Sequence, residues 1–581
     1  MRIKRCFNIL QKSYLQGASF PQLIEAPISA KLMEVVNKYP NNLAVIGYEQ
    51  NIQLTYSEVF EKAKNVAANL LELGAKKGER VGIYATSGVE WYIVQMACSL
   101  ADVVFVTINP AYKTMELEHS LNLAEISILI TTNRERPINM LTNVENLVDE
   151  MQVKHQLNLG LPNLPYLKSV FVINEDEFIG HRRDYYNDFK SNLIDRNPAF
   201  KYKNSVENNM KFQNFKLPAT IHFTSGTGKR AKGVMLSHHN ILNNAYFFGN
   251  EIKYNSDDII CLPVPIHHCF GMVMGNLASM LQGAAVLLPS PSFDAEKTLE
   301  AAYKCDATVL YGRPTHFLDY LEVQSKKEFN FQNLSKGVIG GAQCPTDLVN
   351  RVVRELFISD IYTAFGMTET SAVSFMVKKT DPTLRGTSTV GRIMKHIEAK
   401  VVDENGIPVD TNQTGELMIK GYSTMLGYYN DKQNTVKRFN DGWLVTGDLV
   451  QVDPNGYVRI ISRKKGNVIK GGERISAKEI EEVLHEMDEI ELAQVIGVPD
   501  DRLGMEICVF IKLKDNTVEF TNELVCRFLK EKLSQHKIPK YMKIVSDFPL
   551  NSDGIPIKLQ MVKDWVTEIE EKNNSNEYLL C

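Results

Sequence analysis

The chain has 581 residues and a formal net charge of −4, and these values exclude several classes of protein. At roughly 100–200 residues per domain, the length predicts about three or four domains or subdomains. Hydrophobic residues make up 44% and charged residues 23%, which excludes a disordered or low-complexity chain. The 65 basic and 69 acidic residues leave no general basic field, so we expect no nucleic-acid partner. We also expect no transmembrane segment, because every apolar run is shorter than the ~18 residues that a spanning helix needs.

Residues 1–12 carry four cations, and no acid occurs before Glu25. This composition, without an apolar core, is typical of a mitochondrial targeting segment rather than a secretory signal. The alternative is a solvated basic tail on a cytoplasmic protein.

The first elements alternate between helix and strand. A helical pattern begins at Ser57, a candidate N-cap, and stops at Gly74. A strand is predicted at 80–84, a helix at 90–100 and an apolar strand at 103–108, and the rhythm recurs at 307–311 and 336–340. Such alternation predicts an α/β fold with a parallel sheet.

The regular alternation is interrupted before residue 219, and from Ala399 onward the chain changes character. Residues 201–213 are polar and are predicted to be an irregular surface insertion before a strand at 219–223. Short alternating segments at 400–403, 415–420 and 457–461 predict a compact β subdomain. From residue 463 we expect a small α+β unit, with helices at 477–486 and 521–533 and strands at 491–498 and 506–513.

A glycine- and hydroxyl-rich turn with lysines directly follows the strand at 219–223. Backbone N–H groups, hydroxyls and lysines in such a turn can bind phosphate oxygens. The turn does not match the G-x-x-x-x-G-K-[ST] loop of P-loop NTPases, and taken alone it is more often a plain connection. Its candidate phosphate ligands are Thr224, Ser225, Gly226, Thr227, Gly228, Lys229 and Lys232.

Three further motifs follow in order: Phe365-Gly-Met-Thr-Glu369, Thr446-Gly-Asp448 and Arg463-Lys-Lys465. Together with the turn they resemble the core motifs of the adenylate-forming superfamily, which includes acyl-CoA synthetases, luciferases and peptide-synthetase adenylation domains. Within it, the chain is most similar to medium-chain acyl-CoA synthetases. The resemblance implies a large α/β adenylation domain (13–462), a small mobile α+β C-terminal domain (463–565) and a polar tail (566–581).

The resemblance implies an ATP-dependent fatty acid:CoA ligase that forms acyl-CoA, AMP and diphosphate through an acyl-adenylate, with ATP, CoA and a fatty acid as substrates and Mg²⁺ as cofactor. Glu369 would hold Mg²⁺, with Thr227 nearby, and Thr368 would bind the α-phosphate. Phe365 and the backbone at Gly341 would enclose adenine, and Asp448 and Arg463 would bind ribose. His268 would lie near the acyl pocket, walled by Phe270, Met272, Tyr311 and Ala342. Gly471, Gly472 and Glu473 would lie near the pantetheine path.

Three departures from the family pattern matter. In the phosphate loop, Gly228, Lys229 and Ala231 replace the usual threonine, glycine and proline. Gly466 replaces an aspartate at the hinge. Most seriously, Ile555 stands where the family has its catalytic lysine, and only Lys558 lies close behind it.

The Ile555 substitution keeps an alternative open. The chain could be an adenylation-impaired pseudo-ligase that binds nucleotide, acyl-adenylate or CoA, or that performs only the thioester-forming step. A luciferase-like oxygenation of an adenylate is a weaker third interpretation. The sequence indicates neither the acyl chain length nor the oligomeric state.

Overall fold

The computed structural model describes residues 10–134, 139–148, 159–173, 186–224, 231–341, 344–379, 381, 388–463, 467–514, 520–549, 558–572 and 578–580, except the side chains of 462, 463, 467, 559, 571 and 572. The chain divides into two compact units. The first comprises Met1–Pro110, Leu121–Phe223 and Gly233–Ser462. The second joins Arg463–Cys581 to two earlier segments, Ala111–Ser120 and Thr224–Lys232.

One sheet orders its eight described strands β20-β10-β9-β5-β4-β6-β7-β8. In the part of the sheet from β9 to β8, each pair of neighbouring strands is parallel. Parallel strands need crossover connections, and the helix α3 (Val89–Ala101), for example, connects β4 to β5. Their bounds are β4 Arg80–Tyr84, β5 Val104–Thr107, β6 Ile126–Thr132, β7 Ser169–Ile173, β8 Tyr186–Asp188, β9 Pro218–Thr224, β10 Lys232–Ser237 and β20 Gly427–Tyr428.

A second sheet orders its nine described strands β17-β16-β15-β14-β13-β11-β12-β2-β3. It is parallel from β15 to β2 and antiparallel at both ends. The bounds are β2 Leu43–Gly47, β3 Ile52–Thr55, β11 Ile259–Cys261, β12 Ala285–Leu288, β13 Val309–Gly312, β14 Lys336–Gly340, β15 Asp360–Phe365, β16 Phe375–Met376 and β17 Arg392–Ile393.

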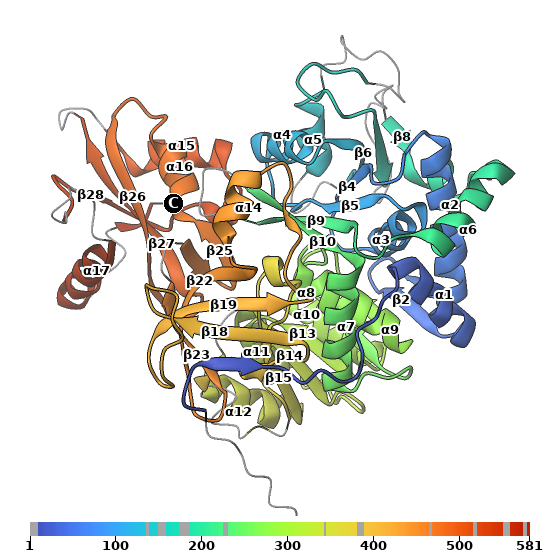
Figure 1. The fold of residues 1–581 in the computed structure, drawn as a ribbon. Coiled ribbons are helices and arrows are strands. Elements are labelled where there is room, and N and C mark those ends of the chain that lie inside the picture. Colours follow the sequence, from blue (N-terminus) through green and yellow to red (C-terminus); the bar gives the residue numbers. More distant parts are fainter. Residues whose placement is uncertain are drawn as a thin grey trace, which may run out of the picture. The chain divides into compact units, whose positions relative to one another are not determined.

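One continuous apolar core contains residues from both sheets and from the helices α1 Ile28–Lys38, α2 Tyr56–Glu72, α3 Val89–Ala101, α7 His238–Ile252 and α9 Ala278–Gln282. A separate core lies on the second sheet under α10 Ala295–Lys304, α11 Pro314–Lys327 and α12 Thr346–Glu355. The sheets therefore have helices packed on their faces, as the α/β prediction required (Figure 1). The remaining described helices of this unit include α5 Met140–Glu145, α6 Phe200–Phe212, α8 Cys269–Gly271 and α14 Lys432–Arg438, with a π-helical segment, η3, at Met272–Leu277.

A smaller antiparallel sheet orders its strands β1-β18-β19-β22-β21, with β23 paired to β22, and confirms the β subdomain predicted after residue 399. The bounds are β1 Tyr14–Gln16, β18 Ile397–Val402, β19 Gly415–Gly421, β21 Phe439–Asn440, β22 Trp443–Val452 and β23 Val458–Arg463. The strand β1 comes from the start of the chain and pairs with β18, with Tyr14 opposite Lys400, so the two strands run side by side in Figure 1.

The second unit contains the small α+β region expected after residue 463. Its hairpin is β24 Asn467–Lys470 with β25 Glu473–Ser476, and its sheet is β26 Ile490–Asp500, β27 Gly504–Leu513 and β28 Tyr541–Ile544. Its helices are α15 Ala477–Leu484, α16 Asn522–Lys532 and α17 Lys558–Lys572, with a 3₁₀ turn, η5, at Gln535–Lys537 and α4 Thr114–Leu123 beginning in the segment Ala111–Ser120. We expected a polar tail from residue 566, but residues 566–572 belong to the helix α17. Farther along, Tyr578 and Leu580 are buried.

Two other predictions about local structure are wrong. The N-cap of α2 is Thr55, not Ser57, because Thr55 and Glu58 form a reciprocal capping box. The segment 201–213 is not an irregular insertion, because all of it except Gln213 belongs to the helix α6. Few of its side chains are apolar, but Val206 is buried in the main core and Tyr202 packs on it one turn earlier.

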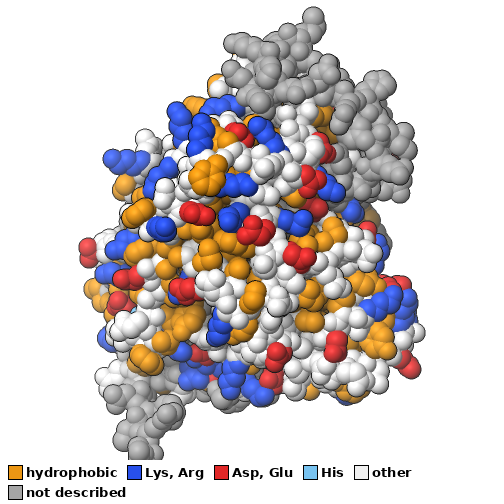
Figure 2. Space-filling model, turned by 90° about the vertical axis from the view of Figure 1, so that its right-hand side faces the viewer, with side chains coloured by type: hydrophobic (Ala, Val, Ile, Leu, Met, Phe, Trp, Pro, Cys, Tyr) orange, Lys and Arg blue, Asp and Glu red, His pale blue; other side chains and the backbone are white. Residues whose placement is uncertain are grey.

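The surface agrees with the balanced composition. Figure 2 shows basic and acidic side chains interspersed with apolar ones on the face in view, without a continuous area of one sign. No helix in the described part of the chain is both long and apolar enough to span a bilayer.

Candidate active site

The predicted nucleotide residues follow the carboxyl ends of parallel strands, where α/β folds usually bind ligands. Thr224 is the last residue of β9. In the second sheet, β14 ends at Gly340 and the parallel neighbour β15 ends at Phe365, with Gly340 opposite Ala364. The predicted phosphate loop, the backbone predicted to contact adenine and the Phe365–Glu369 motif therefore each follow the carboxyl end of a parallel strand.

A tight turn after β15 presents Thr368 and Glu369. A Cβ on Gly366 would lie 1.8 Å from the carbonyl oxygen of Ala372, so only glycine fits there. The hydroxyl of Thr370 accepts the N–H of Met367 at 3.2 Å and closes the 3₁₀ turn Thr368–Thr370. In this turn Thr368 stays partly exposed while Glu369 is buried.

The carboxylate of Glu369 is held by two residues from later in the chain. Tyr428 donates its hydroxyl to Glu369 Oε1 at 2.9 Å, and Arg438 Nη2 lies 3.6 Å from the same oxygen. The backbone is also fixed, because Met425 N–H donates to the carbonyl of Glu369 at 2.9 Å. An oriented hard-oxygen donor of this kind fits Mg²⁺, which usually binds one or two carboxylates plus phosphate oxygens and water. The described residues contain no cluster of three or more His, Cys, Asp or Glu side chains that would indicate a different type of metal site.

Arg438 joins this carboxylate to the Thr446–Asp448 motif. Its Nη2 also donates to the carbonyl of Thr446 at 3.2 Å. The hydroxyl of Thr446 accepts the N–H of Asp448 at 3.1 Å and donates to the carbonyl of Leu417 at 2.8 Å. The guanidinium therefore supports both the predicted Mg²⁺ carboxylate and the turn that carries the predicted ribose carboxylate.

The sequence prediction missed Arg438 and Tyr428. Each lies outside the motifs that carried the resemblance, and nothing in the local pattern distinguishes Arg438 from its exposed neighbour Lys437. The available signal was weak: α14 ends in two basic residues shortly before the Thr446–Asp448 motif, so one of them could have been expected to face it.

Around the expected adenine and acyl positions, the structure brings aromatic and glycine residues together. A Cβ on Gly340 would lie 3.0 Å from the Phe270 ring, and the ring centroids of Phe270 and Tyr311 are 5.4 Å apart. Gly341 has φ +88°, which favours glycine. Phe365 faces Phe375, with ring centroids 6.2 Å apart. Met272 is buried at the start of η3, whereas the fourth predicted wall residue, Ala342, lies outside the described residues.

His268 is exposed at the N-cap of α8. A second histidine, which was not among the predicted site residues, contacts the backbone of the residue before His268. His222, in β9, is buried, and its Nδ1 lies 3.1 Å from the carbonyl oxygen of His267. Burial lowers the pKa of His222 to about 3, so its ring is neutral at pH 7. His222 thus links the strand that precedes the phosphate loop to the backbone beside His268.

Several predicted ligands belong to the second unit. Lys232 begins β10, and His119 Nε2 donates to the carbonyl of Ala231 next to it at 3.0 Å. Gly471 and Gly472 form the turn of the β24–β25 hairpin with φ +55° and +84°, and Glu473 follows them. Residues Ser225, Gly226, Thr227, Gly228, Lys229, Gly466 and Ile555 lie outside the described residues, and so does the side chain of Arg463.

Lys558, the lysine nearest to Ile555, is engaged within the second unit. Its Nζ lies 2.5 Å from Glu481 Oε1 and donates to the carbonyl of Val495 at 3.0 Å. Glu481 also accepts the N–H of Val495 at 2.8 Å, so the three residues form one closed group.

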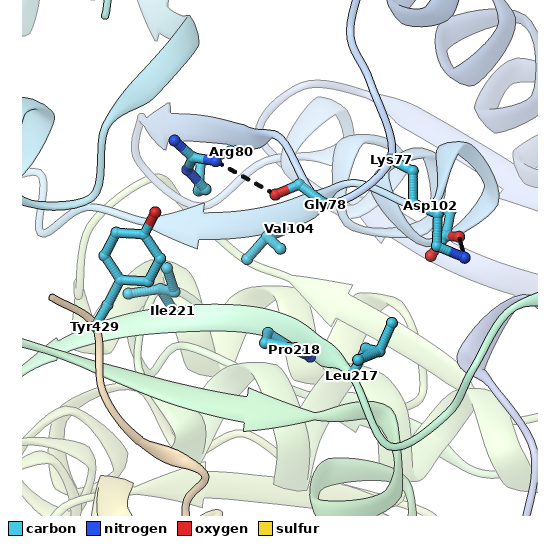
Figure 3. Close-up of a pocket in the computed structure, with 9 residues that line it drawn as sticks. All are labelled: Lys77, Gly78, Arg80, Asp102, Val104, Leu217, Pro218, Ile221 and Tyr429. Atoms are coloured by element: carbon cyan, nitrogen blue, oxygen red, sulfur yellow. Dashed lines mark hydrogen bonds and ion pairs between the residues drawn. The ribbon is translucent and has the colours of Figure 1, made fainter. Parts of the chain in front are cut away.

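A pocket in the first unit does not coincide with these residues. It is lined by Lys77, Gly78, Arg80, Asp102, Val104, Leu217, Pro218, Ile221 and Tyr429. Figure 3 shows Arg80 directed toward the carbonyl of Gly78 and Lys77 paired with Asp102. The pocket lies at the amino ends of β4, β5 and β9, opposite to the end that carries Thr224. Its charged groups are paired, so we assign it no ligand.

Comparison with known proteins agrees with this arrangement. The family model of the AMP-binding enzymes matches residues 32–429, and that of the AMP-binding enzyme C-terminal domain matches residues 479–554. The chain belongs to the AMP-binding, adenylate-forming enzyme family. The sequence resemblance and the α/β fold class are therefore confirmed.

Similar proteins cover almost the whole chain. The chain is 34% identical over 552 residues to a protein of Danio rerio named medium-chain acyl-CoA ligase ACSF2, mitochondrial, covering 94% of this chain and 89% of the relative. It is 34% identical to the putative acyl-CoA synthetase YngI of Bacillus subtilis (strain 168), covering 96% and 99%. Among solved structures, a double mutant of o-succinylbenzoate CoA synthetase (MenE) from Bacillus subtilis has the same fold, with a TM-score of 0.75, 21% identity and coverage of 93% and 99%.

Proposed function

We propose that this adenylate-forming enzyme is a fatty acid:CoA ligase with a preference for medium-chain acids. In the first step a carboxylate oxygen attacks the α-phosphorus of ATP, and the bond to the leaving diphosphate breaks. In the second step the CoA thiol loses its proton, its sulfur attacks the acyl carbon, and AMP leaves. The observation that carries the proposal is the set of contacts that joins Glu369, Tyr428, Arg438 and Thr446 beneath two family motifs.

The proposed roles follow from the chemistry of each side chain. Thr224, Lys232 and the loop residues Ser225–Lys229 would bind the β- and γ-phosphates, and Thr368 would donate to the α-phosphate. Glu369, with Thr227, would hold Mg²⁺, which neutralises phosphate charge when bound. Phe365 and Gly341 would enclose adenine, and Asp448 and Arg463 would bind ribose, since a carboxylate accepts from both sugar hydroxyls. His268 would border the acyl entrance, and Gly471–Glu473 would border the pantetheine path.

The substrate class rests on the ACSF2 relatives, whose name specifies medium-chain acids, and on the apolar residues Phe270, Met272 and Tyr311. The test is a panel of carboxylic acids assayed for ATP- and CoA-dependent thioester formation, with and without Mg²⁺. We expect activity on aliphatic acids of intermediate length, little on aromatic acids, and none without a divalent cation. A preference for aromatic acids would refute the proposed substrate.

A second candidate function is favoured by Ile555 and by the position of Lys558. Isoleucine cannot donate to a carboxylate or a phosphate, and Lys558 is already paired with Glu481. An adenylation-impaired relative would fail in the first step but could still complete the second. The two candidates separate when presynthesised acyl-AMP and CoA are supplied: thioester formation without pyrophosphate exchange would identify the impaired form.

Restoring the missing lysine tests the cause of any weak first step. Ile555→Lys should raise the rate of pyrophosphate exchange by about 100-fold, the size of effect expected for a single preorganised donor to a developing charge. The control Ile557→Lys adds the same charge two residues away and should not raise this rate. If Ile555→Lys leaves exchange unchanged, the isoleucine does not limit adenylation.

We further propose that residues 1–12 direct the protein to mitochondria and that its functional domains are residues 13–462 and 463–565. The basic, acid-poor composition of the first segment and the mitochondrial relatives support the location. A fluorescent fusion of the full chain should localise to mitochondria, whereas replacing Arg2, Lys4 and Arg5 by Gln should leave it in the cytoplasm. Unchanged localisation of that variant would argue against a targeting role.

A further inference from the structure

A buried group of three charged residues ties two distant parts of the chain together within the second unit. Lys537 Nζ lies 2.5 Å from Glu116 Oε1 and 2.7 Å from Glu479 Oε1. The side chains of Lys537, Glu116 and Glu479 are 5%, 7% and 10% exposed, so water contributes little to their solvation. We call Glu116, Glu479 and Lys537 the ion cluster.

Further contacts complete the surroundings of the ion cluster. Ser534 donates its hydroxyl to Glu116 Oε1 at 3.2 Å, and the Lys537 ammonium lies 5.2 Å from the centre of the Tyr112 ring. Burial alone lowers the pKa of a lysine, but Glu116 and Glu479 outweigh it and raise the pKa of Lys537, so the ammonium stays charged. A buried ion cluster is a weak source of stability, because desolvation opposes it, but it can specify one arrangement of the chain.

The two carboxylates connect different segments. Glu479 belongs to α15, in the same C-terminal region as Lys537, so their pair is internal to that region. Glu116 belongs to the segment Ala111–Ser120, whose His119 also donates to the backbone that precedes Lys232. The Glu116–Lys537 ion pair therefore joins the C-terminal region to the segment beside the end of the phosphate loop, together with the contacts of Ser534 and Tyr112.

The same elements fix the glycine hairpin proposed for the pantetheine path. Ser476, the last residue of β25, accepts the N–H of Glu479 and caps α15. On the other side, His536 Nε2 lies 3.5 Å from Glu473 Oε2, directly after the glycine turn. The position of the hairpin is thus linked to Glu116 through Glu473, His536 and the adjacent Lys537.

We propose that Lys537 is a positioning residue for the thioester-forming step, acting through its pair with Glu116. This inference rests on the proposed two-step ligase function. A rotation of the C-terminal region relative to residues 111–120 would separate Lys537 from Glu116, so the cluster favours the arrangement in which it forms. We assign that arrangement to the second step because the glycine hairpin proposed for the pantetheine path is held beside the ion cluster, by Ser476 capping α15 and by the contact of His536 with Glu473. Attack by a thiol needs an oriented path to the acyl carbon, and loss of that orientation slows the step.

The test measures the two half-reactions separately in the full chain. Lys537→Met and Glu116→Gln should each lower the kcat of thioester formation from presynthesised acyl-AMP and CoA by about tenfold or more, since both remove the pair that orients the hairpin. Pyrophosphate exchange should change by no more than about twofold, and so should the KM for ATP. Glu116→Gln leaves Lys537 paired with Glu479, so it remains informative if Lys537→Met fails to fold.

Two matched controls separate positioning from general stability. Glu479→Gln removes a carboxylate of the same cluster but keeps the Glu116–Lys537 pair, and it should retain most of the thioester-forming activity. Lys532→Met removes the more exposed pair with Glu486 and should change neither half-reaction. In addition, Lys537→Arg should recover part of the activity lost in Lys537→Met, because it restores the charge.

Equal losses in both half-reactions, or a loss in Glu479→Gln as large as in Glu116→Gln, would overturn the inference. So would full thioester formation by both Lys537→Met and Glu116→Gln. If the wild-type chain makes no thioester from acyl-AMP and CoA, the proposed function itself fails, and the inference fails with it. If the wild type forms the thioester and Lys537→Met and Glu116→Gln form it equally fast, the proposed function stands. Only the role of Lys537 is then refuted.

Discussion

Two motifs of the first unit that we propose to bind nucleotide, Phe365–Glu369 and Thr446–Asp448, converge on Arg438. It contacts Glu369 and the carbonyl of Thr446, and its Nη2 lies 3.9 Å from the sulfur of Met367, the residue before Thr368. A guanidinium suits this position because its rigid fork can serve several acceptors at once, which an ammonium cannot do with the same geometry. Arg438 would act through these neighbours rather than touch the substrate.

Replacing Arg438 should therefore impair the first half-reaction. Arg438→Met should lower kcat/KM for ATP in Mg²⁺-dependent pyrophosphate exchange by about 10- to 100-fold, the range typical for residues that orient a metal-binding carboxylate. Arg438→Lys should fall between this variant and the wild type. The Mg²⁺ concentration required for half-maximal exchange should also rise in Arg438→Met, which a general loss of folded protein would not produce.

The neighbouring lysine provides the control. Lys437 has the same charge but is exposed, so Lys437→Met should change exchange by no more than about twofold. Comparable losses in Lys437→Met and Arg438→Met would show that total charge near α14, and not the contacts of Arg438, determines the rate.

At the scale of elements, the sequence predicted those whose pattern is strong over several residues. The strands at Arg80–Tyr84 and Lys336–Gly340 have the predicted bounds, because buried parallel strands are continuous apolar runs. The helix α6 was missed because its helical state depends on Val206 reaching the main core, and a single buried side chain leaves almost no periodic signal. The Arg438–Glu369 pair and the ion cluster were not predicted, since the members of each are distant in sequence and are brought together only by the fold.

The N-terminus of α2 provides a direct test of the observed cap against the expected one. Thr55 Oγ1 accepts the N–H of Glu58, and Glu58 Oε2 accepts the N–H of Thr55. Thr55→Ala should lower the free energy of unfolding by about 1 kcal/mol, measured by denaturant titration. Ser57→Ala, one residue inside the helix, should change it by less than about 0.5 kcal/mol. A larger loss of unfolding free energy in Ser57→Ala than in Thr55→Ala would instead support Ser57 as the N-cap.

At the scale of the whole molecule, buried neutral histidines make stability depend on pH. Burial lowers the pKa of both His222 and His238 to about 3. In the unfolded chain each titrates near its ordinary pKa of about 6.5. Unfolding therefore takes up protons below this value, so their contribution to stability is complete above pH ~6.5 and is lost as the pH falls toward 3.

The expected size of this effect is measurable. Between pH 7 and pH 5 each of the two histidines should lower the free energy of unfolding by about 2 kcal/mol. Denaturant titrations at a series of pH values should show this slope, and His222→Asn and His238→Asn should each reduce it. A slope that stays the same in both variants would mean that other groups control the acid sensitivity.

The pairing of β1 with β18 has a consequence for the order of events during synthesis. The Tyr14 hydroxyl donates to the carboxylate of Glu398 in β18, which is 384 residues later in the chain. The strand β1 therefore leaves the ribosome long before the strand that pairs with it. At the usual 5–20 residues per second, that interval lasts roughly 20–80 seconds. Throughout that time the small sheet lacks β18, and the backbone groups of β1 that pair with it stay unpaired by that strand. Any cellular factor that binds an unpaired extended strand would therefore have its opportunity to bind β1 before β18 is synthesised.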